Sequence, residues 1–249
     1  MFLINDKILI NVNNFIYIVP LYNKSNIIGN TVELLKSKFN DSNENAKFLF
    51  VENGSTDDSY NKILSLTESD NRFEVIRSQK GLGAALREGM KYVYESLQTK
   101  DSILILTGAD LPFGFSDLDN YLGDKTENKY DIYIGSKAHK LSQIERTFSR
   151  KIMSKIFNFL IRLFFRVNIG DTQGTYVINL NNVNLLKLLP TSDNFFATAE
   201  ICIKAIKSGY KVVEIPITYM ESDQDKSTVR VFRDTLKIFR EMLYFKFKN

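Results

Sequence analysis

Short apolar runs that each end in a polar or glycine-containing turn are the feature that most constrains the fold of this chain. Four of them predict buried strands, at Phe15–Val19, Phe48–Val51, Ser102–Leu106 and Asp131–Ile134. Segments of helical periodicity lie between them, and a further short strand is expected at Phe73–Ile76. Strands that alternate with helices predict an α/β fold, with a mostly parallel, Rossmann-like sheet covered by helices on both faces.

The remaining elements follow from the same periodicities. Helices are expected around Ile28–Phe39 and at Tyr60–Leu66, Ala84–Leu97, Gln143–Asn168, Asn194–Ser208 and Thr228–Phe247. Strands are expected at Thr175–Ile178 and Lys211–Ile217. The 249 residues contain no repeat or linker, so we expect one domain, with residues 1–136 and 137–249 as its two halves.

Composition excludes several classes of protein. The single Cys202 and the single His139 rule out an internal disulfide and a cysteine- or histidine-rich zinc site. The first residues lack the features of a signal peptide, and no uncharged apolar stretch is long enough to span a bilayer. We therefore expect a cytoplasmic location. A net charge of +4 suits anionic partners, but no motif indicates nucleic-acid binding.

Polar motifs follow the predicted strands. The first strand runs into I-V-P-L-Y-N and the second into V-E-N-G-S-T-D-D-S. A carboxylate at such a strand end can accept hydrogen bonds from a nucleobase or ribose, and ligands of parallel sheets bind at this edge. Ordinary capping of the next helix by Ser55 or Thr56, followed by Asp58, is the alternative.

Two further motifs suit a phosphate group. K-G-L-G-A-A opens a helix whose N-terminus favours anions, and Lys80 can neutralise a diphosphate. The third strand ends in G-A-D-L, with Asp110 as its acid.

These four motifs, in this order and spacing, resemble the family 2 glycosyltransferases. They are most similar to the dolichol-phosphate mannose or glucose synthases and their bacterial polyprenyl-phosphate relatives. Later segments agree, among them I-G-S-K at 134–137, Arg150 with Ser154, D-T-Q at 171–173 and Lys226-Ser227. The resemblance implies a GT-A fold with amphipathic interface helices in the second half. It also implies inverting transfer of a hexose from a UDP- or GDP-linked donor to a polyprenyl or dolichyl phosphate at the membrane surface.

The resemblance also assigns roles to residues. For the nucleotide sugar it implies Pro20, Tyr22, Glu52, Gly54, Asp57, Lys80, Gly81 and Asp110. For the acceptor phosphate it implies Lys137, Arg150, Ser154 and Lys226. Asp110, Lys137 and Arg150 are the catalytic candidates. Because a phosphate acceptor is already ionised, the reaction requires no strong general base.

The metal site is where this chain departs from the family. The family's D-x-D motif holds Mg²⁺ or Mn²⁺, but here Gly108 takes the place of the first Asp and Pro112 that of a Gln. Three explanations stay open: a metal held by Asp110 and the nucleotide, basic residues in place of the metal, or loss of activity.

Two alternative functions are also consistent with the sequence. One is transfer to a saccharide hydroxyl, for which Glu200 or Asp171 is the nearest candidate base. The other is a non-catalytic protein that binds nucleotide sugars.

The segment from Arg150 to Arg166 predicts a helix that lies on a membrane. Its polar residues form one stripe, at Lys151, Lys155, Asn158, Arg162 and Arg166, and most of the others are apolar. An ordinary core helix is the alternative. The last segment, from Val229 to Lys248, repeats this mixture of basic and aromatic residues. It is consistent with a second interfacial helix or with a docking surface for an integral-membrane partner. We therefore expect a protein peripheral to the cytoplasmic face of a membrane.

Overall fold

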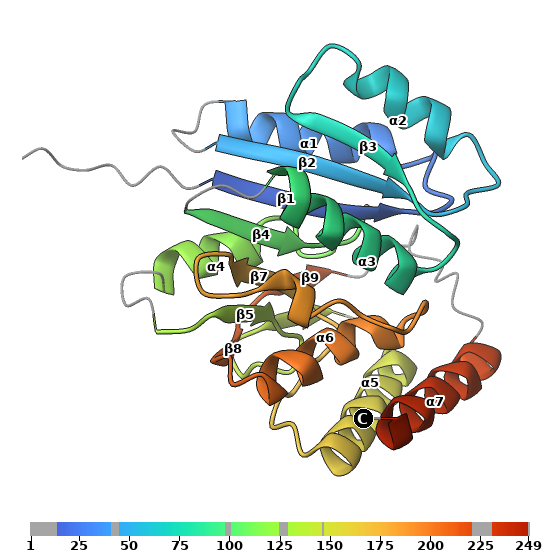
Figure 1. The fold of residues 1–249 in the computed structure, drawn as a ribbon, viewed down its shortest axis with the longest axis vertical. Helices are drawn as coiled ribbons and strands as arrows, with labels where there is room; N and C mark the ends of the chain where they lie inside the picture. The colour runs from blue at the N-terminus through green and yellow to red at the C-terminus, as the bar shows by residue number, and fades with distance from the viewer. Residues whose placement is uncertain are drawn as a thin grey trace, which may run out of the picture.

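The computed structural model describes residues 14–40, 45–97, 101–124, 129–145, 147–220 and 231–248. Its centre is a seven-stranded sheet of order β3-β2-β1-β4-β7-β5-β8 (Figure 1). The strands are β1 (Asn14–Leu21), β2 (Asn45–Glu52), β3 (Phe73–Arg77), β4 (Ser102–Leu106), β5 (Ile132–Gly135), β7 (Thr175–Asn179) and β8 (Val212–Ile215).

One strand of this sheet runs against the others. β1 pairs in parallel with β2 and β4, β2 with β3, and β5 with β8, whereas β7 is antiparallel to both of its neighbours. The register places Tyr176 beside Leu106 and Thr175 beside Gly135. The start of β7 therefore lies at the same edge as the carboxyl ends of β4 and β5. The predicted mostly parallel sheet is confirmed.

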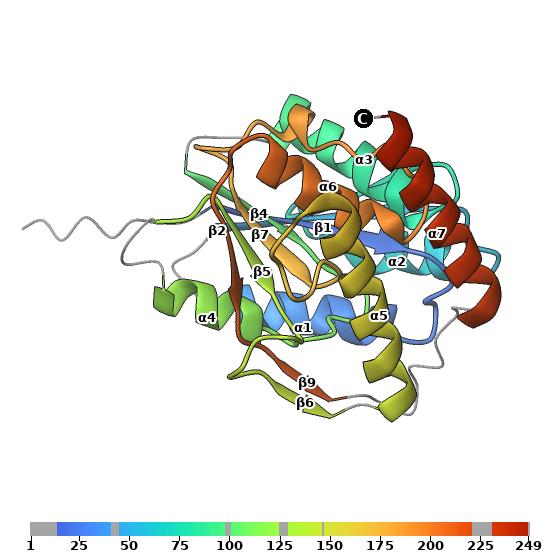
Figure 2. The same cartoon turned by 90° about the horizontal axis from the view of Figure 1, so that it is seen from below.

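Helices cover both faces of the sheet (Figure 2). One core packs the sheet against α3 (Leu82–Tyr92), α5 (Phe148–Phe165), α6 (Phe196–Lys207) and α7 (Val231–Lys248). The other packs it against α1 (Ile28–Asn40), α2 (Ser59–Thr67) and α4 (Ser116–Asp124). Alternation along the strands separates the two cores, with Ile16 and Ile18 facing the first and Tyr17 and Val19 the second.

Three details differ from the sequence prediction. The expected helix over Gln143–Asn168 is wrong at its start, because Gln143–Glu145 forms β6 and pairs with β9 (Thr218–Met220), and α5 begins only at Phe148. This pairing partner is distant in the sequence, so local periodicity could not indicate it. α4 was not predicted. The expected helix at Ala84–Leu97 divides into α3 and a π-helical turn at Val93–Leu97.

α5 and α7 lie side by side (Figures 1 and 2), at the end of the molecule that is away from α1 and α2 (Figure 1). Aromatic contacts join them, with Phe165 and Phe245 ring centroids 5.7 Å apart and Phe164 and Phe239 centroids 6.5 Å apart. The Lys246 ammonium also donates a hydrogen bond to the carbonyl of Phe164, at 2.5 Å. The two predicted interface helices therefore form a single surface.

Candidate active site

The carboxyl ends of β1, β2, β4 and β5 and the start of β7 meet at one edge of the sheet. The turns that follow these strands carry the motifs singled out in the sequence. The D-T-Q segment joins them only because β7 is antiparallel, which brings its preceding loop to the edge where the parallel strands end.

Glu52 at the end of β2 holds its own turn together. Its side chain is only 1% exposed, Oε1 accepts a hydrogen bond from the Ser55 amide at 2.5 Å, and Oε2 lies 3.2 Å from Arg77 Nε. The Arg77 guanidinium also stacks on Tyr60, 4.7 Å from the ring centroid. Burying a carboxylate is costly unless it is paired, and these contacts supply the pairing.

Asp57 caps the start of α2, in place of the caps expected from the sequence. Its Oδ1 accepts hydrogen bonds from the Ser59 amide and hydroxyl, and its Oδ2 from the Ser25 amide. The N-cap residue Asp58 makes no side-chain capping bond, and Ser55 Oγ accepts from the Asn23 amide instead. Burial raises the pKa of Asp57, but the hydrogen bonds from Ser59 and Ser25 outweigh it and lower that pKa to about 2.

Tyr22, Gly54, Lys80 and Gly81 come together beside this turn. The Lys80 ammonium lies 4.8 Å from the Tyr22 ring centroid, and a Cβ added at Gly54 would meet Lys80 Cβ at 3.4 Å. Gly81 has φ 132°, and a Cβ there would approach the Asp193 carbonyl oxygen to 2.2 Å, so this close approach requires glycine. Among the described residues, Lys80 has no carboxylate within ion-pair distance.

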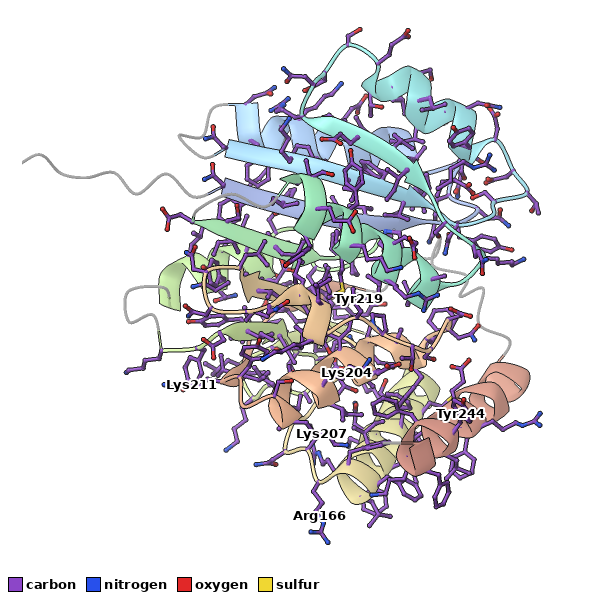
Figure 3. The ribbon with its side chains drawn as sticks, viewed as in Figure 1. Arg166, Lys204, Lys207, Lys211, Tyr219 and Tyr244 are labelled. Carbon is purple, nitrogen blue, oxygen red and sulfur yellow. The ribbon has the colours of Figure 1, made fainter. Side chains whose placement is uncertain are left out.

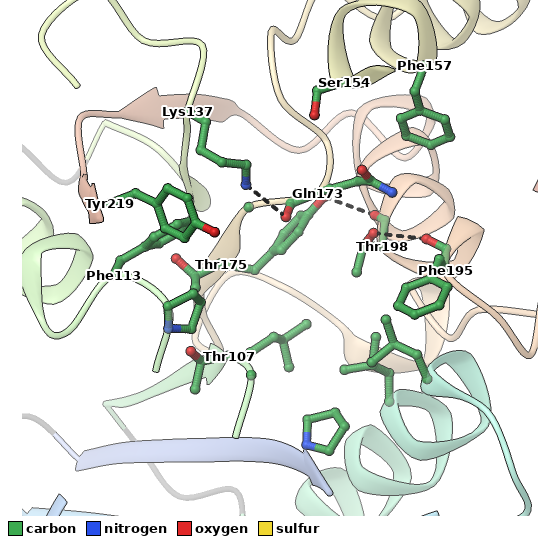
Figure 4. A pocket seen from close by; sticks show the side chains of 18 of the residues that line it. Thr107, Phe113, Lys137, Ser154, Phe157, Gln173, Thr175, Phe195, Thr198 and Tyr219 are labelled. Carbon is green, nitrogen blue, oxygen red and sulfur yellow. Dashed lines mark hydrogen bonds between the residues drawn. The ribbon is translucent and has the colours of Figure 1, made fainter. Parts of the chain in front are cut away.

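A cavity of about 560 Å³ opens next to this group (Figure 4). Pro20, Asp110, Lys137, Ser154 and Gln173 line it, together with apolar side chains of α3, α5 and α7. The other predicted nucleotide-binding residues do not line it. The structure therefore divides the predicted residues into a group on the β1–β2 side and a cavity on the β4–β7 side.

Lys137 lines this cavity, and three groups contact its ammonium. Its Nζ lies 2.9 Å from Asp171 Oδ2, donates to the Gln173 carbonyl at 3.3 Å, and sits 5.0 Å from the Phe113 ring centroid (Figure 4). Its side chain is 15% exposed, and Asp171 is 4% exposed. A partly buried ammonium held from three sides has a fixed direction, as recognition of an anion requires.

Asp110 forms an ion pair that the sequence analysis missed. Lys24, in the turn after β1, places its Nζ 3.6 Å from Asp110 Oδ2. This lysine directly follows the I-V-P-L-Y-N motif, and only the adjacency of β1 and β4 shows which acid it faces.

The described residues do not fit a resident divalent metal. Mg²⁺ and Ca²⁺ need several oxygen ligands, whereas Asp110 is the one carboxylate among the described side chains that line the cavity, and a lysine already faces it. No group of three or more His, Cys, Asp or Glu side chains in the described part of the chain is arranged to hold a metal.

The two acids considered as bases for a hydroxyl acceptor are both engaged in the fold. Glu200 is fully buried, pairs with Lys204 at 2.7 Å and accepts from the amides of Thr191 and Ser192. Asp171 accepts from the Lys137 and Gln173 amides besides its ion pair. Neither carboxylate is presented to the cavity as a free base.

Two predicted acceptor residues cannot be placed in the site. Lys226 lies outside the described residues, and Arg150 lies in the first turn of α5 with its side chain outside them. Ser154, one turn further along α5, does line the cavity.

The helix α5 divides its apolar residues between two directions. Met153, Phe157 and Leu160 line the cavity, and Ile156 contributes to its lining as well as to the exposed side. The outward side carries exposed apolar residues at helical spacing: Ile152 (41% exposed), Ile156 (55%), Phe159 (62%) and Leu163 (61%). We call these four residues the outer ridge.

The predicted polar stripe is only partly a surface feature. Asn158 is buried and accepts hydrogen bonds from the amide and hydroxyl of Thr172, which corrects its assignment to an exposed stripe. Arg162 donates to the Ile169 carbonyl at 3.0 Å. Lys151, Lys155, Arg162 and Arg166 remain exposed and flank the outer ridge, and Arg166 projects outward beyond the end of α5 (Figure 3). None of the helices in the described part has the length and apolar character needed to span a bilayer.

Known proteins match this chain over most of its length. The model of the family described as glycosyl transferase family 2 matches residues 17–184, more than half of the chain. A dolichyl-phosphate beta-glucosyltransferase of Saccharomyces cerevisiae is 24% identical over 252 residues, covering 91% of this chain and 72% of the yeast protein. A polyprenol monophosphomannose synthase of Mycolicibacterium smegmatis is 26% identical, covering 83% of this chain and 77% of that protein.

Solved structures share the fold at lower identity. Glucosyl-3-phosphoglycerate synthase of Mycobacterium tuberculosis, in complex with Mn²⁺, UDP-glucose and phosphoglyceric acid, superposes with a TM-score of 0.63 at 13% identity. The superposition covers 93% of this chain and 77% of that one. Another structure of the same enzyme contains UDP and gives a TM-score of 0.62 over 95% of this chain and 79% of that one. The likeness extends across both halves of the sheet.

Proposed function

Since this chain belongs to glycosyl transferase family 2 and has the GT-A fold, we propose that it transfers a hexose from a nucleotide sugar to a polyprenyl or dolichyl phosphate at a membrane surface. The named activities of the yeast and mycobacterial relatives support a lipid phosphate as the acceptor. The UDP and UDP-glucose bound by the mycobacterial synthase support a nucleotide sugar as the donor.

The observation that carries the proposal is the shape and chemistry of the cavity. Its lining includes the polar side chains of Asp110, Lys137 and Gln173, whereas the residues from α5 and α7 are mostly apolar, Phe157 and Phe239 among them. An isoprenoid phosphate also combines both kinds of group, because an anionic head is joined to an apolar chain. A saccharide acceptor would bring hydroxyl groups against the apolar side chains of α5 and α7, which offer them no hydrogen-bond partners.

The chemistry then requires only alignment and charge stabilisation. A phosphate oxygen of the acceptor attacks the anomeric carbon, the bond from that carbon to the donor diphosphate breaks, and its electron pair leaves with the nucleoside diphosphate. Attack opposite to the leaving group inverts the anomeric configuration. The acceptor is already an anion, so Lys137 serves by holding and orienting it, and no side chain needs to remove a proton.

The α5–α7 surface supports access from a membrane. The outer ridge would enter the boundary between headgroups and acyl chains, and the four flanking cations would contact anionic lipid headgroups. The cavity lies behind the same helix, so an isoprenoid chain would pass from the bilayer along α5 toward Lys137. Membrane contact also explains why apolar side chains of this size remain exposed.

The test uses the full chain with radiolabelled UDP-glucose and GDP-mannose and a short polyprenyl phosphate in detergent micelles. The expected result is a labelled lipid that enters the organic phase, whose anomeric configuration is opposite to that of the donor. The matched acceptor is the corresponding polyprenol, which lacks only the phosphate and is expected to give no product.

Each outcome decides between functions. Product with the polyprenol, or with a saccharide acceptor but not with the lipid phosphate, would replace the proposal by hydroxyl glycosylation. Nucleotide-sugar binding without transfer to any acceptor would indicate a chain that has lost activity.

A further inference from the structure

We infer that Lys24 takes the part of the divalent cation in this enzyme, and that the donor diphosphate binds, without a metal ion, to the Lys24 ammonium that faces Asp110. The inference rests on the proposed function, because it names how that site holds its donor. It also answers the question raised by Gly108, where the family has the first acid of a metal-binding motif.

Lys24 and Asp110 face one another because both of their turns are fixed by the fold. The Lys24 amide donates to Ser59 Oγ at 2.7 Å, and the Lys24 carbonyl accepts from the first amides of α1. On the other side, Thr31 of α1 donates its hydroxyl to the Ala109 carbonyl at 2.6 Å. The same helix therefore orders both turns, so the ion pair is part of the folded scaffold.

Gly108 leaves room for this arrangement. A Cβ added at position 108 would lie 2.5 Å from Asp110 Oδ1, closer than real Cβ contacts allow. The Asp110 carboxylate thus occupies the space into which a first acid of the motif would project. An aspartate at 108 would require this carboxylate to move from its present position.

The charges of this edge support binding of an anion without a metal. An unpaired Asp110 would repel a diphosphate, and a metal normally removes that repulsion. Here the Lys24 ammonium, with an exposed side-chain fraction of 32%, neutralises Asp110 and keeps N–H donors accessible. Lys80 adds a second cation that no described carboxylate neutralises, beside the start of α3, where backbone amides also favour anions.

The decisive measurement is nucleotide affinity by titration calorimetry, for UDP and for GDP, in excess EDTA and in saturating Mn²⁺. The wild-type chain is expected to bind one of the two nucleotides with affinities that agree within about threefold between the two conditions, since no protein ligand is gained by adding the metal. In EDTA, Lys24→Ala is expected to weaken binding by about tenfold or more, because a charge-assisted contact is lost.

Two further variants make the result specific. Lys91→Ala removes the same charge from the far end of α3, where Lys91 pairs with Glu88, and is expected to leave affinity unchanged. Lys24→Arg retains the cation and is expected to retain binding in EDTA, which separates loss of charge from loss of folding.

A second readout follows Mn²⁺ itself by electron paramagnetic resonance. The affinity of the nucleotide for Mn²⁺ is expected to be the same with wild-type protein as without it. The double variant Lys24→Ala, Gly108→Asp is expected to bind Mn²⁺ together with the nucleotide.

Wild-type affinity that rises more than about threefold with Mn²⁺ would overturn the inference, since such a gain indicates a metal held by the protein. Lys24→Ala affinity in EDTA equal to that of wild type would also overturn it. Glycosyl transfer measured in Mn²⁺ would then still support the proposed function. Absence of UDP and GDP binding in both conditions would overturn the inference and the proposed function together.

Discussion

At the scale of single residues, the site is built from charges that hold one another in place. Lys137 with Asp171, Lys24 with Asp110, and Arg77 with Glu52 each place a cation and an acid from different elements at one edge of the sheet. The Lys137 pair is the most buried on its cationic side, so it is the least screened by solvent. Of these three cations, we expect Lys137 to contribute most to binding of the acceptor phosphate.

Replacing Lys137 with alanine is expected to lower kcat/KM for the lipid phosphate by about 100-fold, the usual effect of removing one preorganised donor. Lys137→Arg is the matched control and should keep most activity, because the positive charge remains. Steady-state kinetics would be measured beside thermal unfolding of each variant. Unchanged kcat/KM in a folded Lys137→Ala protein would contradict the assignment.

Asp57 predicts a pH dependence of stability. Its pKa is about 2 in the folded protein and 3.8 in an unperturbed side chain, so its ionised form is favoured by folding. The stability that it contributes is therefore present above about pH 4 and disappears as the pH falls toward 2. Asp57→Asn should be less stable than wild type at neutral pH, and the difference should shrink across this window. Urea unfolding of both proteins at several pH values would measure it, and a constant difference would contradict the prediction.

At the scale of elements, α5 performs two tasks with its two sides. Its inward apolar residues line the cavity, and its outer ridge is exposed. The sequence predicted a wide apolar face with a cationic stripe, and it could not predict that Asn158 would turn inward to Thr172. That hydrogen bond joins α5 to the D-T-Q loop, which follows the helix in the chain, and helical periodicity does not indicate that this loop folds back onto Asn158.

The double variant Phe159→Ser, Leu163→Ser is expected to reduce binding to phosphatidylcholine–phosphatidylglycerol vesicles by about tenfold or more, since two large apolar side chains no longer leave water. Leu34→Ser, Leu64→Ser is the matched control, because those leucines of α1 and α2 are also partly exposed, at 42% and 40%, but lie away from α5. Vesicle flotation would compare the proteins. An equal loss of vesicle binding in both double variants would argue against membrane contact by the outer ridge.

At the scale of the whole molecule, β7 joins the two halves of the chain. It comes from the second half, yet it pairs between β4 and β5 of the first half. Residues 1–136 alone would therefore contain two strands, β4 and β5, whose shared neighbour is missing. We therefore propose that the two halves fold together as a single domain.

We expect the full chain to unfold in urea in one transition, with circular dichroism and tyrosine fluorescence giving coincident curves. The chain has 12 tyrosines and no tryptophan, so tyrosine emission reports on both halves. A fragment of residues 1–136 is the comparison and should show no cooperative transition. Two separated transitions in the full chain would contradict the prediction.

By itself, the sequence determined the alternation of strands and helices, the motifs at the strand ends and the family, because these depend on local periodicity and on short ordered patterns. Lys137, Asp110 and Ser154 could be chosen from it for the same reason. The antiparallel direction of β7 and the pairing of Gln143–Glu145 with Thr218–Met220 are seen only in the tertiary structure. The same holds for Glu52 and Glu200, whose carboxylates accept hydrogen bonds from backbone amides and so stabilise the fold. The tertiary structure also decided that Lys24 faces Asp110, since an ion pair between residues far apart in the chain depends on which strands are neighbours, and no local pattern encodes that.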